Sequence, residues 1–98
     1  MKSIIWNRLA LLDYHKNIDY LLKKWTEQEA IKFIGEVESV IYRLKKGNVS
    51  FEDIGYKNIK KCVVRKQITL YYRHLSENQI ELLRFWNNYQ DVEKIKFK

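Results

Sequence analysis

Two apolar stripes with helical spacing meet at Trp25 and Thr26 with almost no linker, and this junction constrains the fold more than any other feature. Asn7 can cap the first stripe, and Thr26 begins a capping box in which Glu29 is expected to reach back. Two amphipathic helices joined so closely are expected to form an antiparallel hairpin. The stripes consist of Leu11, Tyr14, Ile18, Leu21 and Trp25 in the first helix, and of Ala30, Phe33, Val37, Val40 and Leu44 in the second.

Two glycines bear on the second helix. Gly47 follows Lys45 and Lys46, whose charges suit the negative end of a helix dipole, and it is predicted to end the helix. Gly35 lies in the middle of the helix, where glycine costs about 1 kcal/mol relative to alanine. We therefore expect Gly35 to mark a close contact between the helices.

Beyond Gly47 the apolar period changes from helical to alternating. Residues 47–58 are predicted to form a loop, and residues 59–66, 68–75 and 80–86 are rich in the Val, Ile, Tyr and Trp of β-strands. Residues 3–6 add a short first strand, and the polar tail is expected to dock as a short strand or helix. The sequence thus predicts one α+β domain over residues 1–98 with the order β-α-α-β-β-β, in which the helical hairpin covers one face of a small, mostly antiparallel sheet.

Positive charge is concentrated in the second half of the chain. The net charge is +7, of which residues 1–53 contribute +1 and residues 54–98 contribute +6. Nucleic acid or an acidic protein fits this balance better than a lipid surface, because the basic half reads as strands rather than an amphipathic helix. The single cysteine allows no intrachain disulfide, and no apolar run is long enough for a membrane span or resembles a signal peptide, so a cytoplasmic protein is expected.

The uncovered face of the sheet is the first candidate for a binding surface. Alternation turns Ile68, Leu70 and Tyr72 toward the helices and leaves Thr69, Tyr71 and Arg73 on the open face. The register of the preceding strand stays open: it presents either Lys60, Cys62, Val64 and Lys66, or Lys61, Val63 and Arg65. Either choice places at least two cations near Tyr71 and Arg73, as a phosphate-tracking surface needs, although strands also carry lysine simply to prevent edge pairing.

The sequence contains no convincing catalytic or metal-binding motif. There is no phosphate-binding glycine loop, and His15, Cys62 and His74 lack the spacing of metal ligands, so neither metal nor cofactor is expected. The acid–base candidates of the basic half form no clear pair. They are Tyr71, Tyr72, His74, Glu81 and Tyr89.

Several segments, taken in their order along the chain, carry a resemblance to a known family: IIWN, Asp19-Tyr20-Leu21 in the first helix, KWTEQEAIKFIGEVE, IKKCVVRKQITLYYR and IELLRFWNNYQDVEKI. With them the chain resembles the RelE/ParE superfamily of type II toxin–antitoxin toxins, in its plasmid-stabilisation branch. The resemblance covers nearly all 98 residues and implies the same β-α-α-β-β-β fold. It also implies a growth inhibitor held inactive by a cognate antitoxin, which often docks a flexible acidic segment. RelE-like members cut mRNA on the ribosome without a metal, whereas ParE-like members poison DNA gyrase.

Departures from the family pattern bear on this choice. RelE-like nucleases carry two lysines on the first long strand and an arginine on the next, but here Lys60 matches one lysine, while Cys62 and Thr69 occupy the other two places. In the tail, Tyr89 stands where the branch has arginine and Val92 where it has proline. The residues left for a nuclease are Lys60, Arg65, Arg73 and Tyr89, and those expected to contact a target are Lys60, Lys61, Arg65, Lys66, Tyr71, Arg73, Arg84 and Trp86.

Three hypotheses follow. The leading one is a ParE-like toxin that binds DNA gyrase and is not an enzyme. The second is a RelE-like, metal-independent endoribonuclease that acts on mRNA at the ribosome. The third is an inactive toxin or a non-toxic basic module that binds nucleic acid or an acidic peptide.

Overall fold

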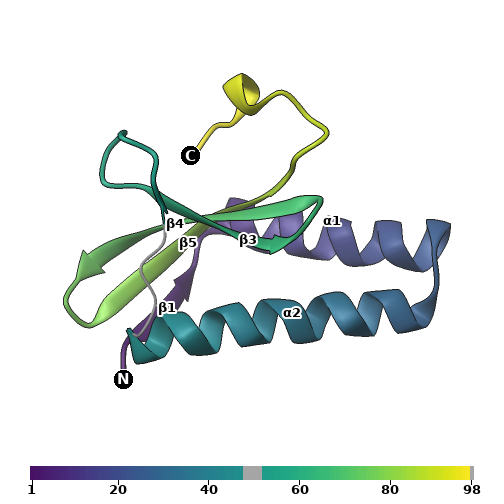
Figure 1. Cartoon of the computed structure of the whole chain (residues 1–98), viewed down its shortest axis with the longest axis horizontal. Helices are drawn as coiled ribbons and strands as arrows, with labels where there is room; N and C mark the ends of the chain where they lie inside the picture. Colours follow the sequence, from purple (N-terminus) through teal and green to yellow (C-terminus); the bar gives the residue numbers. More distant parts are fainter. Residues whose placement is uncertain (48–51, 98) are drawn as a thin grey trace.

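The computed structural model describes residues 1–47 and 52–97 and has an α+β architecture, as predicted (Figure 1). Two helices run antiparallel beneath a sheet, and the C-terminal segment lies above it. Within the described residues, no helix is long and apolar enough to cross a membrane. The elements are β1 (Ser3–Trp6), α1 (Arg8–Lys24), α2 (Glu27–Lys46), β2 (Glu52–Asp53), β3 (Lys60–Arg65), β4 (Ile68–Ser76), β5 (Gln79–Asn87) and the 3-10 helix η1 (Val92–Lys94).

The predicted caps position both helices. The Asn7 side chain accepts a hydrogen bond from the Leu9 amide at 2.8 Å, and the Thr26 hydroxyl accepts one from the Glu29 amide at 3.1 Å. Gly47 ends α2 in the left-handed conformation at φ 69°, which glycine adopts without a steric penalty. The prediction that Glu29 reaches back to Thr26 is wrong, because its carboxylate accepts a hydrogen bond from Arg65 instead.

The apolar stripe of α2 is buried as predicted, but that of α1 is correct only in part. Tyr14, Ile18 and Leu21 contact the core, whereas Leu11 and Trp25 are exposed. The buried line of α1 passes through Ala10 instead of Leu11, and α1 ends at Lys24, so Trp25 leaves the helical spacing.

The contact expected at Gly35 is also wrong. Gly35 is exposed, and beyond its chain neighbours and the backbone of its own helix no atom of the described residues lies within 4 Å of the position that a Cβ would occupy. Its place in the helix is not explained by packing.

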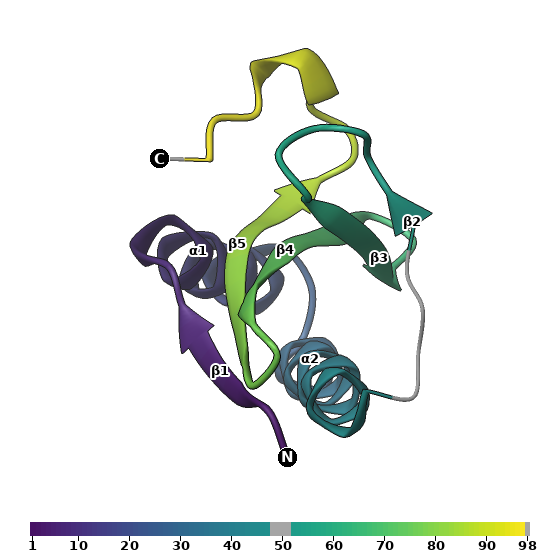
Figure 2. The same cartoon turned by 90° about the vertical axis from the view of Figure 1, so that its left-hand side faces the viewer.

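The sheet has five strands in the order β1-β5-β4-β3-β2 (Figure 2). Among the described residues, β1 and β5 pair in parallel and the other three strand pairs are antiparallel, so the prediction of a mostly antiparallel sheet is confirmed. The three long strands end within one residue of the predicted limits. The loop prediction for residues 47–58 missed β2, whose two residues pair with Lys60 and Lys61; residues 48–51 lie outside the described residues.

Two apolar cores lie on opposite faces of the sheet. The larger core packs between the sheet and the helices and includes Ile68, Leu70 and Tyr72, as predicted. The smaller core, on the other face, contains Ile59, Tyr71, Leu83 and Trp86 and is covered by Ile54, Ile95 and Phe97. The face expected to be open is therefore largely covered: Thr69 is only 7% exposed and Tyr71 only 4%.

Candidate binding surface

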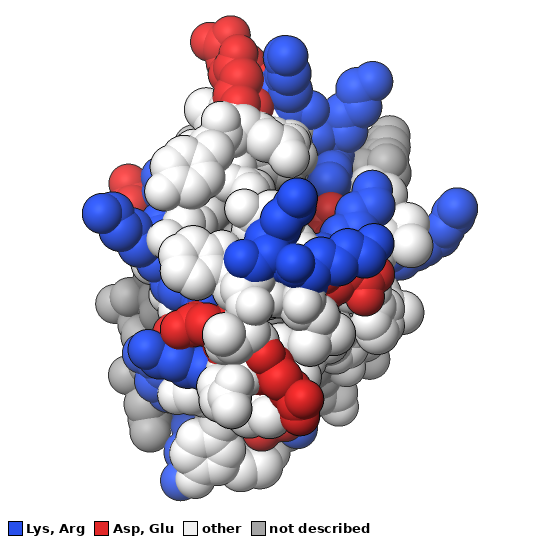
Figure 3. All heavy atoms as spheres, turned by 90° about the vertical axis from the view of Figure 1, so that its right-hand side faces the viewer, with Lys and Arg blue, Asp and Glu red and all other residues white. Residues whose placement is uncertain are grey.

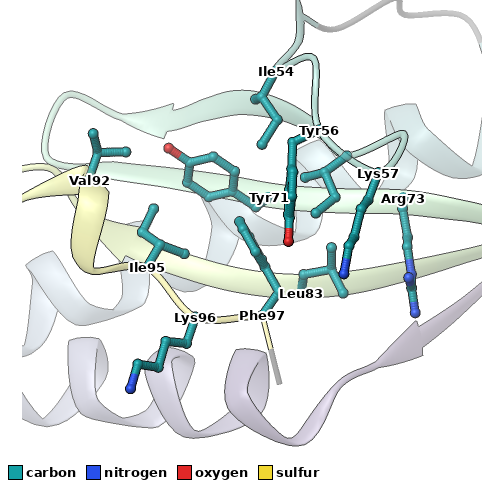
Figure 4. Close-up of a pocket in the computed structure, with 11 residues that line it drawn as sticks. Ile54, Tyr56, Lys57, Tyr71, Arg73, Leu83, Val92, Ile95, Lys96 and Phe97 are labelled. Carbon is teal, nitrogen blue, oxygen red and sulfur yellow. The ribbon is translucent and has the colours of Figure 1, made fainter.

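A groove remains on the covered face of the sheet, between β4 and β5, the loop before β3 and the C-terminal segment (Figure 4). Its volume is about 630 Å³. Tyr71 and Leu83 come from the strands, and Tyr56 and Phe97 come from the two segments that cover them. We call this hollow the sheet groove.

The C-terminal segment is held over the sheet by both apolar and polar contacts. The rings of Phe97 and Tyr71 meet edge to face with centroids 5.6 Å apart. The Trp86 indole N–H donates to the Gln90 carbonyl at 3.4 Å, and the Arg84 guanidinium donates to the Lys96 carbonyl at 2.6 Å. One wall of the groove is thus made by a short segment that has little secondary structure of its own.

Among the described residues, three cations line the sheet groove beside its apolar side chains. They are Lys57, Arg73 and Lys96. Arg73 donates to the Glu81 carboxylate at 2.8 Å, and the Lys57 ammonium lies 5.3 Å from the centre of the Tyr56 ring. An apolar floor with a positive rim suits a negatively charged ligand that carries an apolar or aromatic group.

The register of β3, which the sequence left open, places Lys61 and Val63 on the side of this groove. Lys61 lies opposite Tyr71, and Val63 lies opposite Thr69. A bulge between Val63 and Arg65 then turns Arg65 toward the helices. The expectation of at least two β3 cations beside Tyr71 and Arg73 is therefore wrong, since β3 contributes Lys61 alone to that face.

Arg65 is an internal ion-pair partner of α2. Its guanidinium donates to the carboxylates of Glu36 and Glu29 and stacks over the Phe33 ring, 5.4 Å from the ring centre. Few of its donors are left for a target.

Arg84 is occupied in a similar way. Its Nε donates to Asp13 of α1 at 2.7 Å and a second guanidinium nitrogen donates at 3.0 Å, while the Phe85 amide donates to the same carboxylate at 3.1 Å. Arg84 also stacks over the Trp86 ring. This contact ties α1 to β5 beyond the last pair of β1 and β5, Trp6 and Leu82.

The four nuclease candidates are not brought together. Arg73 lines the sheet groove, whereas Arg65 and Tyr89 line a second hollow, and Lys60 lines neither. Of the remaining residues expected to contact a target, Lys61 and Lys66 are accessible, and Tyr71 and Trp86 are buried in the smaller core.

The surroundings of three titratable side chains near these residues shift their pKa values. Burial, together with the Glu52 carboxylate, raises the pKa of Tyr71, and burial raises that of Tyr72. Burial and the charges of Lys2 and Lys60 lower the pKa of His74. In residues 1–47 and 52–97, no three His, Cys, Asp or Glu side chains gather into a possible metal site.

The sequence reasoning missed the covering residues of the sheet groove: Ile54, Tyr56, Ile95 and Phe97. A signal for the last two was present, because Ile95 and Phe97 alternate with Lys94 and Lys96 at the period of a strand. The composition of the tail indicates only its polarity, and of the two expected forms, a short strand or a short helix, the structure has the short helix η1.

Comparisons with known proteins place the fold. No family model matches the chain, and no curated protein matches it by sequence. Among solved structures, the chromosomal ParDE toxin–antitoxin system of P. aeruginosa aligns with TM-score 0.72 at 16% identity, over 89% of this chain and 96% of that one. A mutant toxin from Helicobacter pylori aligns with TM-score 0.64 at 17% identity, over 91% of this chain and 97% of that one. The YoeB–YefM toxin–antitoxin complex of Staphylococcus aureus aligns with TM-score 0.61 at 12% identity, over 88% of this chain and 95% of that one.

These alignments cover 88–91% of this chain and 95–97% of each matched chain. The fold expected from the sequence resemblance is confirmed. The chain shares its fold with the toxins of these solved structures, as the sequence resemblance implied.

Proposed function

We propose that the protein is the toxin of a type II toxin–antitoxin module, which inhibits growth until a cognate antitoxin binds it. The support is the common architecture: toxins of such systems from several bacteria share the helical hairpin and the sheet at TM-scores up to 0.72. The test is inducible expression in a bacterial host, with growth followed in the presence and absence of the protein encoded by the adjoining reading frame.

For the antitoxin contact we propose the sheet groove. Its interior is apolar, and Lys57, Arg73 and Lys96 make its rim positive. An extended acidic segment with one large apolar side chain would complement both features. Among the related folds, the YoeB and YafQ toxins have been solved with YefM and DinJ, respectively.

For the target we propose DNA gyrase, which the protein would inhibit by binding and not by cleaving a nucleic acid itself. The observation that carries this choice is that Arg73 lines the sheet groove, Arg65 and Tyr89 line the second hollow, and Lys60 lines neither. Cys62 and Thr69, which stand where a nuclease of this superfamily has cations, are both buried. Cleavage of RNA by attack of its 2′-hydroxyl needs a base, an acid and cations within one site, and these residues do not supply them together.

Purified gyrase provides the direct test of the target. Addition of the protein should slow supercoiling or yield cleavage complexes at stoichiometric ratios. Lack of any effect at micromolar excess would count against gyrase while leaving the toxin assignment open.

A ribosome-dependent mRNA endonuclease is the second candidate, and the cationic rim around Tyr56 and Tyr71 is the observation that favours it. It predicts codon-dependent cuts in translated mRNA. The cuts should disappear in Arg73→Ala and persist in Lys46→Ala, because Lys46 lies at the end of α2 and outside the groove.

A further inference from the structure

A second hollow, of about 590 Å³, opens at the end of the molecule where the helical hairpin turns. It lies between the end of α1, the start of α2, the turn between β3 and β4, and the end of β5. Figure 3 views this end, where Lys and Arg side chains gather across the middle of the surface with uncharged side chains beside them. We call this hollow the hairpin pocket.

Exposed aromatic side chains line the hairpin pocket. Trp25 is 64% exposed and Tyr89 is 79% exposed, and Tyr20 is also exposed. None of the three belongs to either apolar core. Aromatic faces on an open hollow offer stacking surfaces for a planar ring such as a nucleobase.

Side-chain amides from three different elements also line the pocket: Asn17 of α1, Gln67 of the β3–β4 turn and Asn87 of β5. All three residues are half-buried. The Asn87 amide oxygen accepts from the Tyr89 N–H, which leaves its NH₂ group, and within the described chain the amides of Asn17 and Gln67 have no hydrogen-bond partner. Amides present donors and acceptors side by side, as the edges of nucleobases do.

The charges of the pocket favour a phosphate at its mouth. The carboxylates of Glu29 and Glu36 are both engaged by Arg65. Lys32 and Lys66 are exposed, and neither forms an ion pair with any carboxylate that the structure describes. Two ammonium groups are thus available beside aromatic and amide groups.

From this combination we propose that the hairpin pocket binds a nucleoside phosphate, with the base against the aromatic and amide side chains and the phosphate at Lys32 and Lys66. The volume lies within the range of small-ligand sites, about 300–1,000 Å³. Amide side chains from three elements favour a polar ligand with a specific hydrogen-bonding edge over an apolar protein surface. The site is separate from the sheet groove, so its failure would leave the proposed function untouched.

Isothermal titration calorimetry of the full chain with AMP tests the proposal, with ribose 5-phosphate as the ligand that lacks a base. AMP should bind, and ribose 5-phosphate should bind about tenfold more weakly or worse, because it cannot stack. Tyr89→Ala should weaken AMP binding about fivefold or more. Tyr42→Ala is the matched control, since Tyr42 is an exposed tyrosine of α2 that lines neither hollow. Lys66→Gln should weaken the binding of both AMP and ribose 5-phosphate.

Titration with a single-stranded octaadenylate distinguishes a free nucleotide from a nucleic acid strand as the ligand of the pocket. Tighter binding of the oligonucleotide than of AMP would assign the pocket to a nucleic acid strand, and equal or weaker binding would assign it to a free nucleotide. Absence of AMP binding at millimolar concentration would overturn the proposal, as would equal binding of ribose 5-phosphate or an unchanged affinity in a folded Tyr89→Ala variant. Binding of an acidic peptide at Trp25, without binding of AMP or ribose 5-phosphate, would assign the surface to a protein partner. That result would also overturn the proposal.

Discussion

Replacement of Asp13 by alanine should destabilise the protein more than most single changes, because it removes three hydrogen bonds and one charge at a single point. The Asp13 carboxylate accepts from two nitrogens of Arg84 and from the Phe85 amide, and the two charged side chains are only 13% and 15% exposed. Removing one partner of a buried ion pair costs about 3–5 kcal/mol. Arg84 keeps the Lys96 carbonyl as an acceptor, which favours the lower end of that range, so we expect a loss of about 3 kcal/mol in the free energy of unfolding.

Urea unfolding of Asp13→Ala, Arg84→Met and the double variant separates the pair from its surroundings. The double variant should lose less than the sum of the two single variants, by about 2 kcal/mol, because the unpaired guanidinium is then absent. A loss below about 1 kcal/mol in Asp13→Ala, or additive losses, would refute the assignment of Arg84 as a structural partner. Arg84 would then again be a candidate for target binding.

Three further predictions concern single residues. Gly35→Ala should stabilise the protein by about 0.5–1 kcal/mol in thermal unfolding, since the Cβ meets open space in the helix; destabilisation would reveal a contact at this face. Burial raises the pKa of Cys62 to about 12, so its thiol should resist Ellman's reagent in native protein and react fully in urea, and fast native reaction would contradict its burial. The pKa of His74 is lowered in the folded state, so the unfolded chain binds the proton more tightly, and stability should fall as pH drops below about 6.5. His74→Gln should remove part of this pH dependence.

The fold was predictable because local signals agreed with one another. The caps at Asn7, Thr26 and Gly47 and the change of period after α2 fix the helical hairpin and the strands, and the structure has them nearly where the pattern places them. The error in α1 has a simple cause. Leu11 and Trp25 fit the helical spacing, but alanine at position 10 fills the crowded side of the helix, and small residues contribute little to a hydrophobic pattern.

The candidate site was less predictable, because it depends on tertiary contacts. The alternation of side chains along β4 correctly predicts its two faces, but it cannot show that a tail of mixed composition folds back over one of them. Nor does the sequence reveal the bulge that turns Arg65 toward Glu36, or the pairing of Arg84 with Asp13 across 71 residues. Positive charge in a strand therefore overstated the number of cations available to a target.

Growth after induction tests the central claim most directly. Expression of the intact chain alone should stop the growth of its host, and co-expression of the protein encoded by the adjoining reading frame should restore it. In the arrested cells, DNA gyrase should be trapped as cleavage complexes. Normal growth at a high level of folded protein, without any antitoxin present, would contradict the account and favour a non-toxic binding module.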